Sequence, residues 1–176
     1  MDILDTIKFL FINLETPLMF VALAASYRIG ASARAVLYMC LIMLAKQFID
    51  LGFVQACFEI YDTLSGNGKM NLVAVWHLFF VITEGLFVWV SYVLLTTHRF
   101  QIRNYVRVLV ITAAVRSYLH MAQGIEVVWF SSSHIQPIYS YGVPVLDYVM
   151  ISALFVGVYQ CYQKRIEFGE RIAWTS

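Results

Sequence analysis

Ionisable residues lie inside long apolar stretches of this chain, where such side chains are rare, and six of them are the main candidates. They are Lys46, Asp50, Glu84, Arg116, His120 and Asp147. Carboxylates can hold protons or cations, the two bases can attract an anionic group, and a histidine can relay a proton. Because hydrocarbon disfavours charge, these side chains should face a bundle interior, a partner or a water-filled path. We therefore predict that these residues bind an ion or a small polar ligand.

The spacing of the candidates places several of them on shared helix faces. Lys46 and Asp50 are four residues apart, which brings two side chains together on a helix. Arg116 and His120 have the same spacing, and at about 100° per residue they form one polar stripe. Residues that share a face or a depth with these six form a secondary set: His77, Gln123, Glu126 and Glu15.

A structural interpretation competes with the functional one. Buried pairs can fix the arrangement of helices without adding net stability. Under this interpretation Lys46 pairs with Asp50 or Glu84, and Arg116 pairs with Glu84 or Asp147. The two bases nearly balance the acids around them, so both interpretations stay open.

The composition of the chain indicates the environment in which these charges must act. Hydrophobic residues make up 61% of the chain and charged residues 13%, and the mean hydropathy is +0.73. A soluble domain has about 25% charged and about 45–50% apolar residues. The net charge of +1 lacks the basic excess of a nucleic-acid-binding protein. The chain is therefore expected to be an integral membrane protein with the lipid bilayer as its surroundings.

The expected fold is all-α, a polytopic transmembrane helical bundle that forms a single domain over residues 1–176. A helix needs about 20 mostly apolar residues to cross the bilayer. Five stretches meet this length, and a cytoplasmic tail over 163–176 follows them: 4–27, 35–58, 72–96, 106–130 and 143–162.

The orientation follows from lysine and arginine, which accumulate on the cytoplasmic side of membrane proteins. The side formed by the first connector, the third connector and the tail holds Arg28, Arg34, Arg99, Arg103, Arg107, Lys164, Arg165 and Arg171. The opposite side holds only Lys8 and Lys69. We expect the N-terminus outside and the C-terminus in the cytoplasm, in a plasma or inner membrane.

The first stretch is interrupted by Glu15-Thr16-Pro17. Proline removes one backbone donor from a helix, but transmembrane helices tolerate it. We expect a kinked transmembrane helix here. The alternative is an interfacial helix over residues 2–14 followed by a short re-entrant segment.

No motif in the sequence identifies a cofactor, a metal site or a catalytic centre. Nucleotide-binding loops, nucleophile elbows and zinc-binding histidine spacings are absent. At 1.5 Å per residue, His77 and His120 differ in depth by more than about one helical turn, which argues against a haem between them. No cofactor and no metal is predicted, and an enzyme is the least favoured class.

Two function classes remain. The first is a small membrane protein whose buried polar residues conduct, transport or sense a small ion or polar ligand. The second is a non-catalytic membrane subunit or interaction protein, with its charges paired inside the bundle or with helices of a partner. A homo-oligomer and a membrane-protein partner both remain open.

Overall fold

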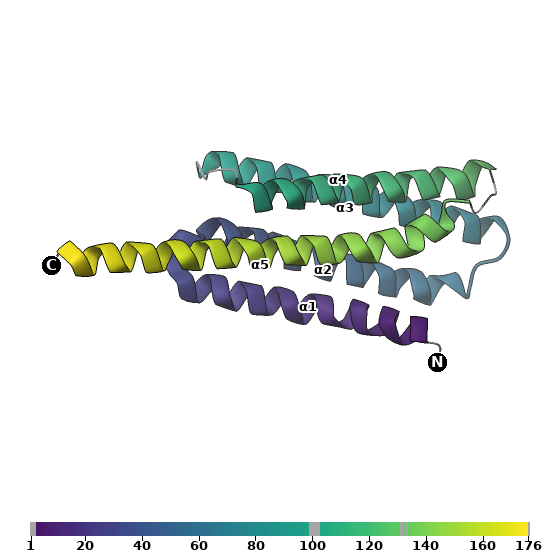
Figure 1. Ribbon diagram of the computed structural model, residues 1–176. Helices are drawn as coiled ribbons and strands as arrows, with labels where there is room; N and C mark the ends of the chain where they lie inside the picture. The colour runs from purple at the N-terminus through teal and green to yellow at the C-terminus, as the bar shows by residue number, and fades with distance from the viewer. Residues whose placement is uncertain (1–2, 99–102, 131, 133, 176) are drawn as a thin grey trace.

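The computed structural model contains five long α-helices over the residues that it describes (Figure 1). Those residues are 3–98, 103–130, 132 and 134–175, with helix side chains described from 14 to 167. The helices are α1 (Ile3–Ile29), α2 (Arg34–Tyr61), α3 (Asn67–Thr97), α4 (Asn104–Ile125) and α5 (Gln136–Thr175). A 3₁₀ turn over Gly30–Ala33 joins α1 to α2, and a π-helical turn over Glu126–Phe130 extends α4.

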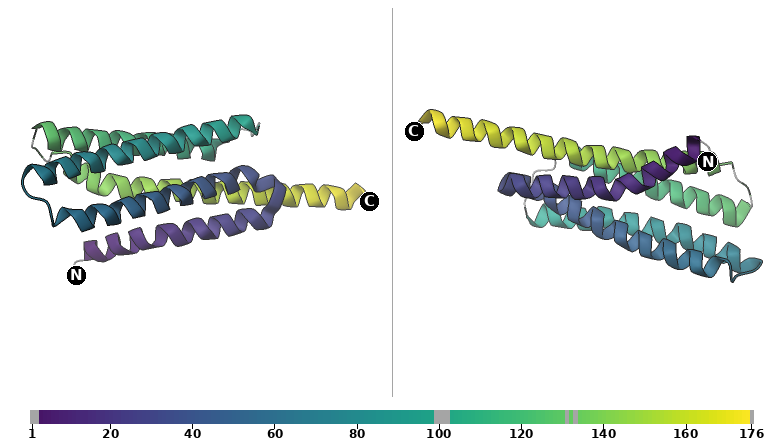
Figure 2. Two further views of the ribbon diagram at one scale, coloured as in Figure 1. Left: turned by 180° about the vertical axis from the view of Figure 1, so that it is seen from behind. Right: turned by 90° about the horizontal axis from the view of Figure 1, so that it is seen from below.

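The helices run up and down along one common direction, as three views agree (Figures 1 and 2). Each helix packs against the next in the chain, and α5 returns to pack against α1. The reversal between α1 and α2 is tight, and Gly30 takes a φ of 81° there, a backbone conformation that glycine adopts without a steric penalty. The C-terminal part of α5 projects past the end of the other helices.

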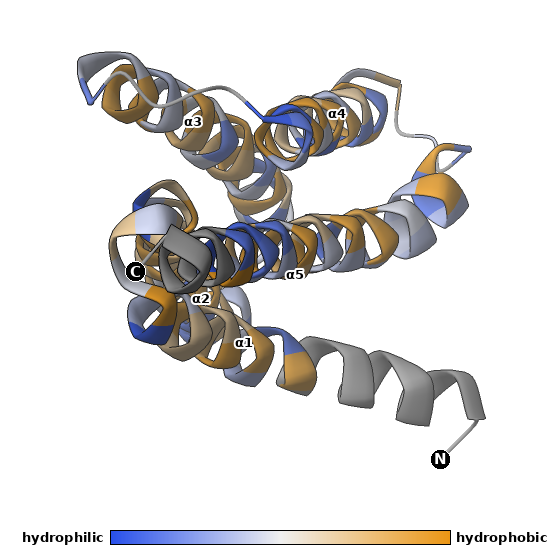
Figure 3. Ribbon diagram, turned by 60° about the vertical axis from the view of Figure 1, so that its left-hand side comes forward, coloured by the Kyte–Doolittle hydropathy of each residue, from blue (hydrophilic) through white to orange (hydrophobic). Residues whose placement is uncertain are grey.

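Four helical segments are long and apolar enough to cross a membrane, by length and composition. They are Leu14–Tyr61, Asn67–Thr97, Asn104–Phe130 and Gln136–Glu167. The first of them joins α1 from Leu14 onward, the 3₁₀ turn and α2 in one segment. Figure 3 shows apolar residues along every labelled helix. The expected all-α class is therefore confirmed, and so is the presence of several apolar helices long enough to span a membrane.

Two helices differ from the sequence expectation in their ends or continuity. The α1 helix continues unbroken through Pro17, so the described backbone has one helix where the alternative had an interfacial helix and a re-entrant segment. The α5 helix begins at Gln136 rather than at 143, and it includes Pro144. Pro137 lies in the first turn of α5, where a missing backbone N–H is tolerated. The residues expected as a tail continue the same helix to Thr175.

The apolar core lies along the axis of the bundle, and large apolar side chains also face outward. Val36, Leu109 and Leu154 are fully buried. Trp89 and Ile111, by contrast, each expose 62% of their surface. Outward apolar side chains of this size suit a lipid environment. The buried polar residues therefore lie inside a bundle that exposes many large apolar side chains.

Candidate functional site

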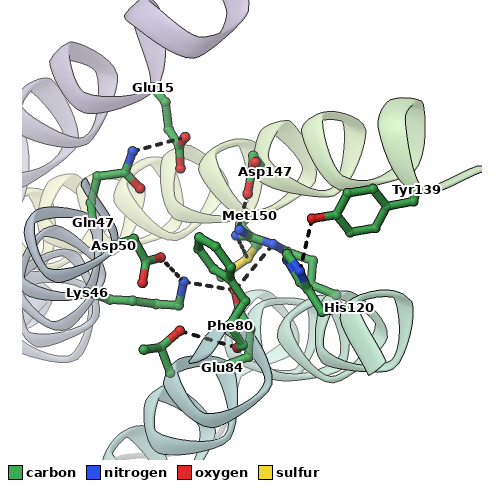
Figure 4. A network of polar contacts seen from close by, with 12 residues as sticks. Glu15, Lys46, Gln47, Asp50, Phe80, Glu84, His120, Tyr139, Asp147 and Met150 are labelled. Carbon is green, nitrogen blue, oxygen red and sulfur yellow. Dashed lines mark hydrogen bonds and ion pairs between the residues drawn. The ribbon is translucent and has the colours of Figure 1, made fainter. Parts of the chain in front are cut away.

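Five charged residues from four helices form one connected chain of ion pairs (Figure 4). Lys46 Nζ lies 2.5 Å from Asp50 Oδ2 and 2.9 Å from Glu84 Oε1. Arg116 Nε lies 3.3 Å from the same Glu84 oxygen, and Arg116 Nη1 pairs with Asp147 Oδ1. Negative and positive side chains alternate along this series of ion pairs, from Asp50 at one end to Asp147 at the other. We call these five residues the buried charge network.

Glu84 on α3 is the centre of the buried charge network. Its side chain is 0% exposed, and its Oε1 faces Lys46 from α2 and Arg116 from α4. The other carboxylate oxygen, Glu84 Oε2, is buried and has no hydrogen-bond partner among the described residues. Asp50 Oδ1 is in the same situation. The network therefore keeps unused acceptor oxygens on two of its acids.

Acids outnumber bases in the network. Asp50, Glu84 and Asp147 face only Lys46 and Arg116, so full ionisation leaves a surplus of one negative charge. A fourth acid lies beside them, because Glu15 Oε2 on α1 accepts a hydrogen bond of 3.3 Å from Gln47 Nε2 (Figure 4). An unbalanced charge in an apolar interior carries a large desolvation penalty.

The helix spacings explain how the network is held. Lys46 and Asp50 occupy one face of α2 because they are four residues apart. Asp147 and Met150 are three apart on α5, and Arg116 contacts both of them, with Met150 Sδ at 3.8 Å from Nη1. The guanidinium thus bridges α4 to α3 and to α5. Its three contacts restrict the orientation of the side chain.

A second polar cluster lies one helical turn along α4, at His120. The His120 ring stacks on Phe80 with 4.7 Å between the centroids. Its Nδ1 lies 3.1 Å from the hydroxyl of Tyr139, and its centroid lies 6.0 Å from that of His77. His120 Nε2 and His77 Nδ1 are buried without a hydrogen-bond partner in the described chain. This cluster adjoins the network, because His120 is four residues from Arg116 on one face of α4.

The two histidines lie on helices that approach each other closely. A Cβ added at Gly124 of α4 would lie 2.9 Å from the Cβ of His77 on α3. Glycine is therefore needed at this level for the helices to pack. Counting residues along each helix cannot detect such an approach.

A cavity of about 430 Å³ opens where α2, α3, α4 and α5 meet, at the end of the bundle that carries the α2–α3 and α4–α5 connections. We call it the end cavity. Gln123 Nε2 donates a hydrogen bond of 2.7 Å to Gln136 Oε1 at its wall. Other lining residues that matter below are Cys57, Phe58, Trp76, His77, Val127 and Tyr139.

Glu126 stabilises the connection between α4 and α5. Its carboxylate accepts hydrogen bonds from the backbone N–H of His134 at 2.6 Å, from that of Ile135 at 2.8 Å and from the Ser132 hydroxyl at 3.0 Å. These bonds hold the residues that directly precede α5 against the end of the α4 segment. The position of Glu126 at the edge of the polar stripe has thus a structural explanation.

The structure contains all four ion pairs that the structural interpretation named as alternatives. Five of the six main candidates form the network, and the sixth, His120, lies one turn away. The sequence interpretation missed Tyr139 and Gln136 because it placed both in a connector. Pro137 was the signal that could have placed both residues on a helix, because proline is favoured in the first turn of a helix.

No group of three or more potential metal-ligating side chains is close enough to hold a metal within the described chain. No family model, no curated protein and no solved structure matches this chain. Its function is therefore argued from the arrangement of its own residues.

Proposed function

We propose that this protein senses or transports a proton or a small cation, which the buried charge network takes up and releases. The observation that carries the proposal is the excess of acids over bases in a connected buried network. Asp50 and Glu84 also retain carboxylate oxygens with no partner among the described residues. A proton or a small cation on such an oxygen neutralises the surplus charge.

The charge balance sets what the ion must be. Moving one carboxylate from water into an apolar interior carries an idealised penalty of about 20 kcal/mol, which falls to several kcal/mol after relaxation. Neutralisation by a single positive charge removes most of that penalty. Protons and monovalent cations supply one charge, and the surplus of the five-residue network is one.

Polar groups that lie between the end cavity and the buried charge network support exchange with the outside of the bundle. Gln136 and Tyr139 line the end cavity, and the Tyr139 hydroxyl contacts His120. His120 lies four residues from Arg116, which contacts Glu84 and Asp147. Hydroxyl and imidazole groups can both donate and accept, so they can pass a proton. The end cavity would then be the entrance and the network the binding site.

The proposal includes a topology of five spans, with the N-terminus outside and the C-terminus in the cytoplasm of a plasma or inner membrane. The antiparallel course of α1 and α2 supports counting α1 as a separate span. Arg28 and Arg34 flank the first turn, and Arg103, Lys164 and Arg165 lie at the same end of the bundle by the order of the helices. The end cavity would face the outside.

The test combines infrared spectroscopy with flux. A protonated carboxyl group in the network should give a carbonyl band that shifts on exchange into heavy water. Glu84→Gln should weaken the band, and Glu15→Gln added to it should remove the band, because each change eliminates one acid. Glu59→Gln is the matched control, since Glu59 is an exposed acid on α2.

Flux is measured on protein reconstituted in liposomes with a trapped pH-sensitive dye and a potassium diffusion potential, and repeated with sodium outside. Transport predicts ion entry in the wild type and in Glu59→Gln, and none in Glu84→Gln. A band without flux would identify a sensor. The proposal would be refuted if the wild type showed no protonated carboxyl band and its infrared spectrum did not change when cations were added.

A second candidate is a non-catalytic membrane subunit or interaction protein. The observation that favours it is that all four ion pairs form within the bundle. Each charged residue of the network therefore has an oppositely charged partner in this chain. Under this function the wild type shows no ion-dependent signal, and Glu84→Gln changes only assembly or stability. Purification of a stoichiometric partner from native membranes would support it.

A further inference from the structure

The end cavity has the size and lining of a small-molecule site. Its volume of about 430 Å³ falls within the range of about 300–1,000 Å³ typical of such sites. Most of its wall is apolar or aromatic, including Phe58 and Trp76. None of the residues that line it is an aspartate, a glutamate, a lysine or an arginine. An uncharged and mostly apolar occupant suits such a wall.

One buried polar atom at the wall has no hydrogen-bond partner among the described residues, and a ligand could provide one. Gln123 is 1% exposed, and its Oε1 has no hydrogen-bond partner in the described chain. Its Nε2 donates to Gln136 Oε1, and the Gln136 amide in turn donates to Ser140 Oγ at 3.3 Å, which leaves Gln123 Oε1 unpaired in this arrangement. Gln123 Oε1 is therefore an acceptor that requires a donor.

A second such atom lies on the same wall. His77 is 7% exposed, and its Nδ1 is buried without a partner among the described residues. An imidazole nitrogen can donate or accept, depending on the tautomer. A hydroxyl group can donate to one atom and accept from another. Leaving buried polar groups unpaired is unfavourable, so a hydroxyl at this wall would be stabilising.

We propose that the end cavity binds an uncharged, mostly apolar aromatic or alicyclic alcohol, whose hydroxyl group donates a hydrogen bond to Gln123 Oε1. The apolar body of the ligand packs against Phe58 and Trp76. This site uses none of the five residues of the buried charge network, although it occupies the end cavity that we propose as the entrance for the ion.

Three probes of nearly equal shape isolate the hydrogen bond: 2-naphthol, 2-methoxynaphthalene and naphthalene. Affinities are obtained from the dependence of the unfolding temperature on probe concentration, for the full chain in detergent. 2-Naphthol should bind about 2- to 10-fold more tightly than 2-methoxynaphthalene, which is the net effect of one hydrogen bond. Gln123→Leu should remove that difference.

Two matched variants locate the site. Val127→Trp fills the end cavity and should abolish binding of all three probes, whereas Val149→Trp adds the same side chain on the exposed face of α5 and should not. A second measurement needs no variant. Because Cys57 lines the end cavity, 2-naphthol should slow its alkylation by N-ethylmaleimide, followed by peptide mass spectrometry.

Equal affinity for the three probes in the wild-type chain would overturn the proposal, because the cavity would then be an apolar groove without a hydrogen-bonding position. Unchanged binding to Val127→Trp would place the probes elsewhere and would overturn it as well. Loss of ion-dependent signals in Glu84→Gln with normal 2-naphthol binding would separate this site from the ion-binding function.

Discussion

Removal of the Arg116 charge should destabilise the protein far more than removal of the Glu84 charge, although Glu84 is the more deeply buried. Arg116→Met leaves three acids opposite Lys46 alone, so Asp147 becomes an unpaired buried charge. Removing one partner of a buried pair costs about 3–5 kcal/mol of unfolding free energy. We expect a loss in that range for Arg116→Met.

Glu84→Gln should cost only about 1–2 kcal/mol, because it leaves two complete pairs. Lys46 remains with Asp50, and Arg116 remains with Asp147, so two bases face two acids. The amide oxygen of the glutamine can still accept hydrogen bonds from both bases. The variant should therefore fold, which makes its flux and infrared measurements interpretable.

The assay is unfolding in mixed micelles with increasing dodecyl sulfate, followed by tryptophan fluorescence. Arg116→Met, Asp147→Asn and the double variant form a double-mutant cycle, which measures the coupling of the pair. The double variant leaves Lys46 opposite Asp50 and Glu84, with the same surplus of one acid as the wild type. It should be more stable than Arg116→Met alone by about 1–3 kcal/mol.

The reasoning fails if Glu84→Gln is as destabilising as Arg116→Met. It fails also if the double variant shows the sum of the two single losses. Either result would mean that the charge balance of the network does not determine its stability.

Two further predictions concern packing and topology. Gly124→Ala should destabilise the bundle by about 1–3 kcal/mol, since the added Cβ would lie 2.9 Å from that of His77; Gly85→Ala, with nothing within 4 Å, is the control in the same unfolding assay. If the five-span topology is correct, Lys69→Cys should react with an impermeant maleimide added outside intact cells, and Lys164→Cys should react only after permeabilisation. Labelling of both from one side would contradict it.

Much of the candidate site could be predicted from local spacing. The pairing of Lys46 with Asp50 follows from a separation of four residues on a helix. For Arg116 the sequence predicts two alternative partners on other helices. The depth of a residue along its helix does not specify which neighbouring side chain it contacts. The structure selects both alternatives at once, since the guanidinium contacts Glu84 and Asp147 with different nitrogens.

Other parts of the site could not be predicted, for two physical reasons. Tyr139 joins His120 only because α5 begins at Gln136, and the start of a helix depends on capping by Glu126 from a preceding segment. The His77 and His120 rings meet only because Gly124 permits a close approach of two helices. Both contacts depend on a third residue that belongs to a different segment from one of the two partners.

The sequence by itself determined that this is an all-α protein with several apolar helices and ionisable residues among them, because composition and helical periodicity are local properties of a chain. Only the tertiary structure decided which acid meets which base, that three acids and two bases form one connected network, and where the end cavity opens. Those properties arise from contacts between helices, and such contacts depend on how five helices pack together.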